Sequence, residues 1–185
     1  VQSGVYDAFA EKLSAAVAKL KTGNGFEDAV NLGPVVDADA LAKVYDHVAD
    51  ARAKGATVLT GGECLGGLFY APTVLTGAVS TMKLAREETF GPVAPLFRFD
   101  TVDEVIRLAN DTEFGLAAYF FARDIARVYR VAEALEYGMV GINTGLISTE
   151  VAPFGGVKQS GQGREGSRHG IEDYLETKYL CLGGV

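Results

Sequence analysis

A short acidic and aromatic stretch in the middle of the chain, Arg86–Pro92, has residue types that could bind a ligand. It reads Arg-Glu-Glu-Thr-Phe-Gly-Pro and runs directly into an apolar segment. Gly91 permits a positive φ, and Pro92 fixes φ and removes a donor, so the corner is rigid. The carboxylate of Glu88 can accept two hydroxyl hydrogen bonds, and the ring of Phe90 can pack on a planar ring. The pair suits a ribose joined to a flat heterocycle; the alternative is an acidic turn with a buried Phe anchor.

A glycine-rich stretch, Pro153–Glu165, follows later in the chain. It is not a phosphate-binding loop by spacing, because Lys158 stands two residues before Ser160 and no Gly-Lys-Ser/Thr step is present. We expect the glycines to allow tight backbone turns around a cavity. Arg164 and Glu165 are interpreted as framework residues held by local structure.

Both stretches resemble segments of the aldehyde dehydrogenase family. The first resembles its Glu-Glu-x-Phe-Gly-Pro motif, and the second its Pro-Phe-Gly-Gly-x-Lys-x-Ser-Gly-x-Gly-Arg-Glu segment. The resemblance implies that Glu88 binds the hydroxyls of the nicotinamide ribose and that Phe90 packs beside the nicotinamide of NAD or NADP. It also implies that Phe154 lines the substrate tunnel. Lys43 resembles a lysine that reaches the cofactor ribose, although Ala40 replaces an amide side chain nearby and a solvated lysine is the alternative.

Within the family, the chain most resembles the succinate-semialdehyde dehydrogenases, through Asn143–Ser148 and the tail Arg164–Glu176. The resemblance implies that Ser148 helps to bind the terminal carboxylate of the substrate; the alternative is a hydroxyl that caps its own loop. One hydroxyl cannot hold a carboxylate unaided, and arginine is its usual partner. The resemblance places such arginines before Val1. Another aldehyde substrate, such as glutarate semialdehyde, remains open.

The implied reaction oxidises an aldehyde to an acid. A thiolate attacks the aldehyde, hydride leaves to the nicotinamide, and a Glu-activated water hydrolyses the thioester. The resemblance places the nucleophilic Cys, the general base and the dinucleotide-binding domain before Val1, so no catalytic residue is assigned here. Cys64 and Cys181 have no neighbouring base and are interpreted as bystanders. We therefore expect this chain alone to be inactive. A non-catalytic oligomerisation module is the remaining hypothesis.

The elements that must position these residues alternate along the chain. Their order predicts an α/β fold with a mostly parallel, doubly wound sheet, whose chemistry lies beyond the carboxyl ends of the strands. We expect residues 1–170 to be the C-terminal part of a catalytic domain and residues 171–185 an oligomerisation tail. Thr177–Leu182 alternates like an edge strand, and the resemblance implies that it joins a neighbouring subunit in a dimer or tetramer. Hydrophobic spacing and turn residues predict helices over 5–21, 38–54, 102–109 and 125–137, and strands over 56–60, 69–75, 93–99, 117–122 and 139–143.

The composition limits the kinds of partner that the chain is expected to bind. The 185 residues carry a net charge of −7, which argues against a nucleic-acid surface. No apolar run approaches the roughly 20 residues that span a bilayer, so no membrane partner is expected. Two cysteines give neither a disulfide framework nor a metal cluster, which is typical of a reducing compartment, and we expect a cytoplasmic protein. His47 and His169 lack metal-like or base-like company and are expected to be structural or surface residues.

Overall fold

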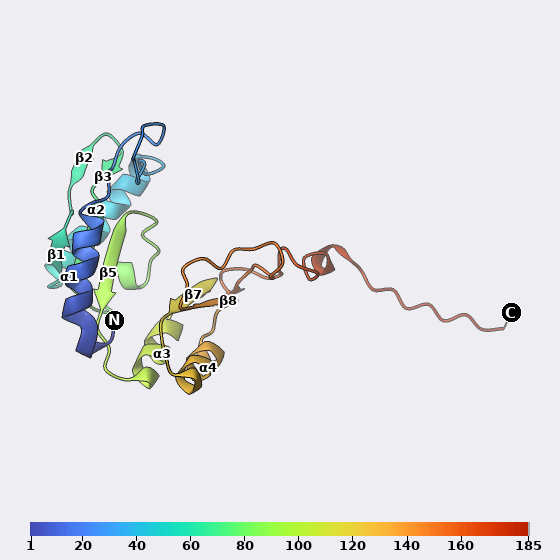
Figure 1. The fold of residues 1–185 in the computed structure, drawn as a ribbon. Coiled ribbons are helices and arrows are strands. Elements are labelled where there is room, and N and C mark those ends of the chain that lie inside the picture. The colour runs from blue at the N-terminus through green and yellow to red at the C-terminus, as the bar shows by residue number, and fades with distance from the viewer. Residues whose placement is uncertain (185) are drawn as a thin grey trace. The chain divides into compact units, whose positions relative to one another are not determined.

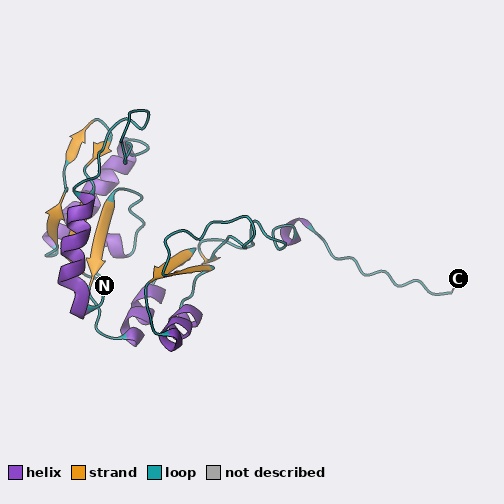
Figure 2. Ribbon diagram, in the orientation of Figure 1, coloured by secondary structure: helices purple, strands orange, loops and turns teal. Residues whose placement is uncertain are grey.

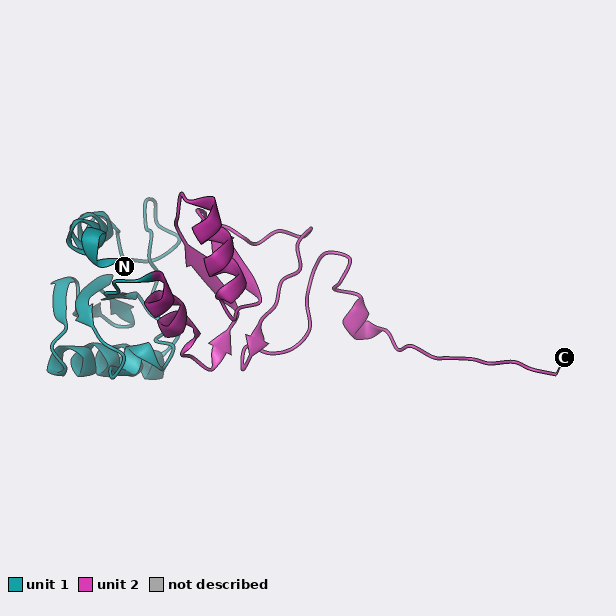
Figure 3. Cartoon of the chain, turned by 90° about the horizontal axis from the view of Figure 1, so that it is seen from below, with its two compact units in different colours: residues 1–101 teal, residues 102–185 magenta. Residues whose placement is uncertain are grey.

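The structure is a computed structural model that describes residues 1–184. The chain divides into two compact units, Val1–Thr101 and a second that begins at Val102, coloured separately in Figure 3. The first unit contains the acidic and aromatic corner, and the second contains the glycine-rich stretch. The elements of the first unit are η1 (Ser3–Val5), α1 (Tyr6–Val17), α2 (Ala38–Ala53), β1 (Thr57–Thr60), β2 (Cys64–Gly66), β3 (Phe69–Tyr70), β4 (Thr73–Ala78), η2 (Lys83–Ala85) and β5 (Val93–Phe97).

A three-stranded sheet in the order β1-β4-β5 forms the centre of the first unit (Figure 1). Strand β1 pairs antiparallel with β4, and β4 pairs parallel with β5. Val74 of β4 packs in one apolar cluster with Tyr6 and Ala10 of α1. The adjacent Leu75 packs in another cluster with Val44 of α2. Since successive side chains of a strand point to opposite faces, α1 and α2 cover opposite faces of this sheet.

The sequence signals at the two ends of α2 predict its bounds to within one residue. The Asp37 side chain accepts a hydrogen bond of 2.8 Å from the Ala40 backbone N–H, so Asp37 is the predicted N-cap. The helix ends at Ala53, and Gly55 follows with a φ of 98°, a conformation open to glycine. In contrast, α1 is shorter than predicted, because it ends at Val17.

The segment predicted as one strand over 69–75 is two strands. Strand β3 pairs antiparallel with β2, and β4 starts only at Thr73. Pro72 lies between them and has no N–H to donate to a ladder. The Thr73 N–H donates instead to the Pro92 carbonyl at 2.8 Å, which starts the pairing with β5.

The second unit contains a β-α-β arrangement in which α4 connects two parallel strands, β7 and β8 (Figure 2). Asp124 caps α4 as predicted, since its carboxylate accepts a 2.8 Å hydrogen bond from the Arg127 N–H. Strands β6 and β9 form a separate antiparallel pair. The elements are α3 (Val102–Asn110), β6 (Phe114–Gly115), β7 (Ala117–Phe120), α4 (Ile125–Ala134), β8 (Met139–Ile142), β9 (Val157–Lys158) and η3 (Glu172–Tyr174).

The α/β class is confirmed, but the single mostly parallel sheet is not what residues 1–184 form. Their strands belong to four separate sheets, one of three strands and three of two strands, and β5 and β7 lie in different ones. The predicted strand Thr177–Leu182 is also absent from the described tail, in which Tyr179 and Leu180 are exposed. Both differences have the same physical reason, because alternation predicts an extended segment, but a strand also needs a partner edge to form a ladder. The doubly wound sheet and the C-terminal strand therefore stay predictions.

None of the helices described for residues 1–184 combines the length and the apolar character required to cross a membrane.

Candidate functional site

The acidic and aromatic corner, Glu87–Gly91, lies between η2 and β5. The Phe90 side chain is 80% exposed, so the alternative of a buried Phe anchor is wrong. Phe90 also has a φ of +48°, which is uncommon for a residue with a side chain and is typical of strained functional positions. Glu88 is exposed, and among the described residues its carboxylate has no hydrogen-bond or ion-pair partner. Both predicted cofactor-binding groups are therefore open to a ligand.

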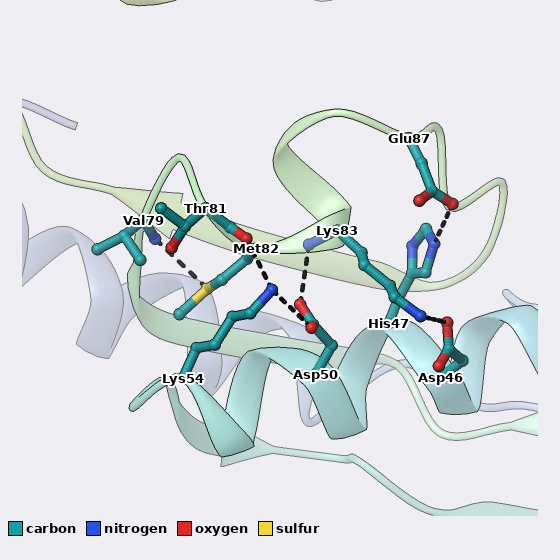
Figure 4. A network of polar contacts seen from close by, with 9 residues as sticks. All are labelled: Asp46, His47, Asp50, Lys54, Val79, Thr81, Met82, Lys83 and Glu87. Carbon is teal, nitrogen blue, oxygen red and sulfur yellow. Dashed lines mark hydrogen bonds and ion pairs between the residues drawn. The ribbon is translucent and has the colours of Figure 1, made fainter.

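His47 of α2 holds this corner in place. Its side chain is fully buried. Its Nδ1 lies 3.0 Å from Thr89 Oγ1 and its Nε2 lies 3.2 Å from Glu87 Oε2; the second contact is drawn in Figure 4. Of the two expected alternatives, a structural or a surface residue, the structural one is confirmed for His47, but its two specific partners were not predicted. The signal was in the sequence: His47 falls on the apolar stripe of α2, where a buried polar ring must find partners.

A second set of contacts ties α2 to the turn before the corner (Figure 4). Asp50 accepts a 2.8 Å hydrogen bond from the Lys83 backbone N–H and pairs with Lys54 at 2.7 Å. Lys54 also donates to the Thr81 carbonyl at 2.7 Å, and Lys83 pairs with Asp46 at 2.6 Å. The hydrogen bond from Lys54 is the main cause that lowers the pKa of Asp50. The hydrogen bond from Asp46 is the main cause that raises the pKa of Lys83.

Gly91 lets the corner lie directly on α2. A Cβ at this position would overlap the Cγ2 methyl group of Val44, which is fully buried. Lys43 precedes Val44 on α2 and is exposed, and among the described residues its ammonium has no partner. Lys43 also lies one helical turn before His47, so it is on the helix face that meets the corner. Glu88 and Phe90 thus lie in the corner itself, and Lys43 lies on α2, the helix that contacts the corner through His47.

The loop that carries Ser148 follows β8. Asn143, at a φ of +57°, exchanges two hydrogen bonds with the Ala122 backbone, at 2.9 and 2.8 Å. Thr144 Oγ1 accepts a 3.2 Å hydrogen bond from the Leu146 N–H. Ser148 is exposed, and its hydroxyl has no partner within the described part of the chain. The alternative that Ser148 caps its own loop is therefore wrong.

The glycine-rich stretch is held by its own backbone. Phe154 and Glu165 exchange backbone hydrogen bonds of 2.9 and 2.7 Å. The Arg164 guanidinium donates to the carbonyls of Gly156 and Gly163, at 2.8 and 2.7 Å. These contacts close the loop, which confirms Arg164 as a framework residue.

The glycine-rich stretch borders an open pocket. A pocket of about 580 Å³ opens in the second unit, and its lining includes Leu116, Phe154, Arg164 and Tyr174. Phe154 is 38% exposed, so its ring contributes to this surface. Ser148 is not among the lining residues, and the structure does not bring the two predicted substrate-binding residues into one pocket.

The donor set fits a nicotinamide nucleotide better than a metal ion. A free carboxylate can accept the two hydroxyls of a ribose, an exposed ring can pack on a planar base, and an ammonium can donate to hydroxyl oxygens. Within residues 1–184, no group of three or more His, Cys, Asp and Glu side chains is arranged to hold a metal ion.

Comparison with known proteins gives a match along nearly all of the chain. The sequence pattern described as "Aldehyde dehydrogenase family" matches residues 1–180. A glutarate-semialdehyde dehydrogenase of Pseudomonas putida is 67% identical over 182 residues, which cover 98% of this chain and 38% of that protein. A succinate-semialdehyde dehydrogenase [NADP(+)] of Escherichia coli is 62% identical, covering 99% of this chain and 38% of that protein.

The fold agrees with the sequence match. A crystal structure of succinate-semialdehyde dehydrogenase from Burkholderia pseudomallei superposes with a TM-score of 0.96 at 66% identity, over 98% of this chain and 38% of that one. The chain thus spans about 38% of the length of the relatives that it matches. The chain belongs to the aldehyde dehydrogenase family.

Proposed function

We propose that this chain is the C-terminal part of an NAD(P)-dependent aldehyde dehydrogenase that oxidises succinate semialdehyde to succinate, with glutarate semialdehyde as the alternative substrate. The observation that carries the proposal is the corner of the first unit, where an unpartnered Glu88 stands beside an exposed and strained Phe90. Four relatives of 62–67% identity are named for succinate or glutarate semialdehyde, and one of 63% identity is named for 3-sulfolactaldehyde. Each of these aldehydes carries an anionic group, which supports an acidic aldehyde as the substrate class.

In this proposal the cofactor supplies the hydride acceptor, and residues of the chain orient it. The Glu88 carboxylate accepts hydrogen bonds from the two ribose hydroxyls and so fixes the sugar. The Phe90 ring packs against the nicotinamide and limits its rotation. Lys43 adds a hydrogen bond to the ribose from α2. Orientation of this kind raises the rate because the reacting atoms are already in place when they meet.

At the other end of the substrate, Ser148 donates a hydrogen bond to the carboxylate, and Phe154 lines the path to the reacting carbon. The carboxylate also needs arginine partners from the remainder of the protein. Succinate and glutarate semialdehydes differ by one methylene group, and one methylene typically changes discrimination by only about 1–3 kcal/mol. We therefore expect one enzyme to accept both substrates with different efficiency.

The pairing of Val1–Ser3 indicates where the missing nucleophile would lie. The Ser3 N–H donates to the Phe99 carbonyl at 2.8 Å, and Gln2 pairs with Phe99 in parallel. Residues that precede Val1 in a longer protein would extend this parallel ladder beside β5, by about 3.3 Å for each residue. That path leads towards Pro92 and the Glu88 corner, so we place the catalytic cysteine there.

The rest of the molecule belongs to the same proposal. In the longer protein, strands from both units join a larger, doubly wound sheet, and residues 1–170 complete the catalytic domain. The exposed tail, residues 171–185, adds to the sheet of a neighbouring subunit in a dimer or tetramer, because an extended segment gains its backbone hydrogen bonds at an open edge. The protein acts in the cytoplasm, where Cys64 and Cys181 remain thiols.

The test is an assay of the full-length protein with succinate semialdehyde, glutarate semialdehyde and a neutral aldehyde of similar length, each with NAD⁺ and NADP⁺. Hydrogen bonds to a charged group contribute about 1.5–3 kcal/mol, so we expect kcat/KM to be roughly 10- to 100-fold higher for the two acids. Equal efficiency with the neutral aldehyde would contradict the assigned substrate class. No cofactor reduction with any aldehyde would favour the non-catalytic oligomerisation module.

A further inference from the structure

We propose that His47 is a positioning residue, whose two ring nitrogens set the orientation of the cofactor-binding corner. This inference rests on the proposed role of Glu88 and Phe90 in binding the nicotinamide nucleotide. It adds a residue that touches neither cofactor nor substrate and acts through the two neighbours of Glu88.

The contacts of His47 are placed on both sides of Glu88 in the chain. Thr89 Oγ1 lies 3.0 Å from Nδ1, and Glu87 Oε2 lies 3.2 Å from Nε2. Both flanking side chains therefore turn towards α2, while Glu88 between them stays exposed and without a partner in the described part of the chain. His47 thus restrains the residues on either side of Glu88, Glu87 and Thr89. A ligand that binds the Glu88 carboxylate therefore meets a side chain on a restrained segment of backbone.

The two partners of His47 differ in what they can do. An ionised Glu87 carboxylate only accepts, so Nε2 carries a hydrogen and donates to it. The Thr89 hydroxyl can donate to Nδ1 or accept from it. Both nitrogens of this fully buried ring therefore have a partner.

The corner needs such support because its backbone is strained. Phe90 has a φ of +48°, a conformation that persists only where neighbouring contacts over-determine it. His47 restrains the residues before Phe90, and the close contact of Gly91 with Val44 restrains the residue after it. Without the His47 contacts, Glu87–Phe90 is free to relax away from the geometry that presents the carboxylate and the ring together.

The experiment uses the full-length protein and variants that each keep one contact. The amide of His47→Asn lies near the position of Nδ1 and can keep the bond to Thr89, whereas the longer His47→Gln places its amide near Nε2 and can keep the bond to Glu87. We expect either change to raise the KM and the dissociation constant of the cofactor by about 10- to 100-fold. The KM of the aldehyde is expected to stay within about twofold, because uniform loss of structure would move all constants together.

A double-mutant cycle with Glu87→Ala tests the coupling. In the His47→Asn background the contact to Glu87 is already lost, so Glu87→Ala should weaken cofactor binding there far less than in the unaltered protein. His169→Gln is the matched control: His169 also pairs with a glutamate, Glu172 at 3.1 Å, but it is partly exposed and remote in sequence from the corner. It should leave cofactor binding unchanged.

Glu88→Gln separates the two hypotheses. If Glu88→Gln weakens cofactor binding while both His47 variants lower only the melting temperature, the positioning role is overturned and the proposed function stands. If Glu88→Gln leaves the affinity for NAD(P) unchanged, the proposed role of the corner is itself overturned. Additive effects in the Glu87 cycle would also contradict the positioning role, even if every variant binds the cofactor more weakly.

Discussion

At the residue scale, Ser148 is held in place by its loop and not by contacts of its own. Asn143 anchors the start of the loop through two hydrogen bonds to Ala122, and the Ser148 hydroxyl has no partner among the described residues. An exposed hydroxyl on an anchored loop is free to donate to a substrate group. Its contribution should therefore appear in substrate binding and not in stability.

We expect Ser148→Ala in the full-length protein to raise the KM for succinate semialdehyde about tenfold, which corresponds to about 1.4 kcal/mol. The KM for a neutral aldehyde should not change, because that substrate has no carboxylate to accept the bond. Steady-state kinetics with both substrates measures this. Thr149→Ala removes the adjacent exposed hydroxyl and is the control. If Ser148→Ala raised the KM for both aldehydes, the substitution would have disturbed the loop itself.

At the element scale, α2 supports the corner through a polar face as well as through its apolar stripe. Asp46 and Asp50 of α2, and Lys54 at the end of the helix, contact the turn that contains η2 (Figure 4). His47 of α2 contacts Glu87, which lies later in the same loop (Figure 4). The carboxylate of Asp50 serves two donors, Lys54 and the Lys83 N–H, and its side chain is only 14% exposed. These two contacts of Asp50 are stronger while the carboxylate is ionised, because hydrogen bonds to a charged acceptor are stronger than those to a neutral one.

This gives a pH dependence with a defined sign. The pKa of Asp50 is lowered in the folded protein, chiefly by the hydrogen bond from Lys54. The stabilisation is therefore present above the unfolded value of about 3.9 and is lost as the pH falls through the lower folded pKa. We expect Asp50→Asn to reduce the free energy of unfolding at neutral pH and to flatten its fall in acid. Urea unfolding from pH 6 to pH 3 measures this.

Glu11→Gln is a suitable control for that series, because Glu11 is an exposed carboxylate on α1 without a partner in the described residues. We expect Glu11→Gln to leave the pH dependence of the free energy of unfolding unchanged between pH 6 and pH 3. An Asp50→Asn variant that loses stability in acid as steeply as the unaltered protein would refute the role given to the Asp50 contacts.

At the scale of the whole molecule, each unit exposes large apolar side chains. Phe26 and Val36 of the first unit are 99% and 79% exposed, and Phe121, Leu146 and Tyr179 of the second are 74%, 90% and 85% exposed. The chain also covers only 38% of the relatives that it matches. Both facts support the proposal that further segments and a second subunit pack on these surfaces.

We expect the isolated chain of 185 residues to be inactive. The proposal assigns the nucleophilic cysteine to residues before Val1, and neither Cys64 nor Cys181 has an activating base beside it. Incubation with succinate semialdehyde and NAD⁺ or NADP⁺ should give no reduced cofactor, whereas the full-length protein under the same conditions should. Appreciable turnover by the isolated chain would refute the placement of the nucleophile.

Features that depend on nearby residues were predictable from the sequence. The caps Asp37 and Asp124 bond to backbone N–H groups three residues away, so they could be recognised from a single turn of sequence. The identities of Glu88, Phe90 and Phe154 were also available, since resemblance to a family depends on residue type and order. These predictions use no information about partners that are distant in the chain.

The tertiary structure decided the rest, because it depends on contacts between distant residues. Which strands pair, and the bonding of His47 to residues 40 and 42 positions away, follow from how α2 packs on the later loop. The exposure of Phe90 and its positive φ also depend on that packing. A sequence pattern states which side chains prefer burial or a turn, but the partner that satisfies a buried ring or an open strand edge is fixed only when the chain is folded.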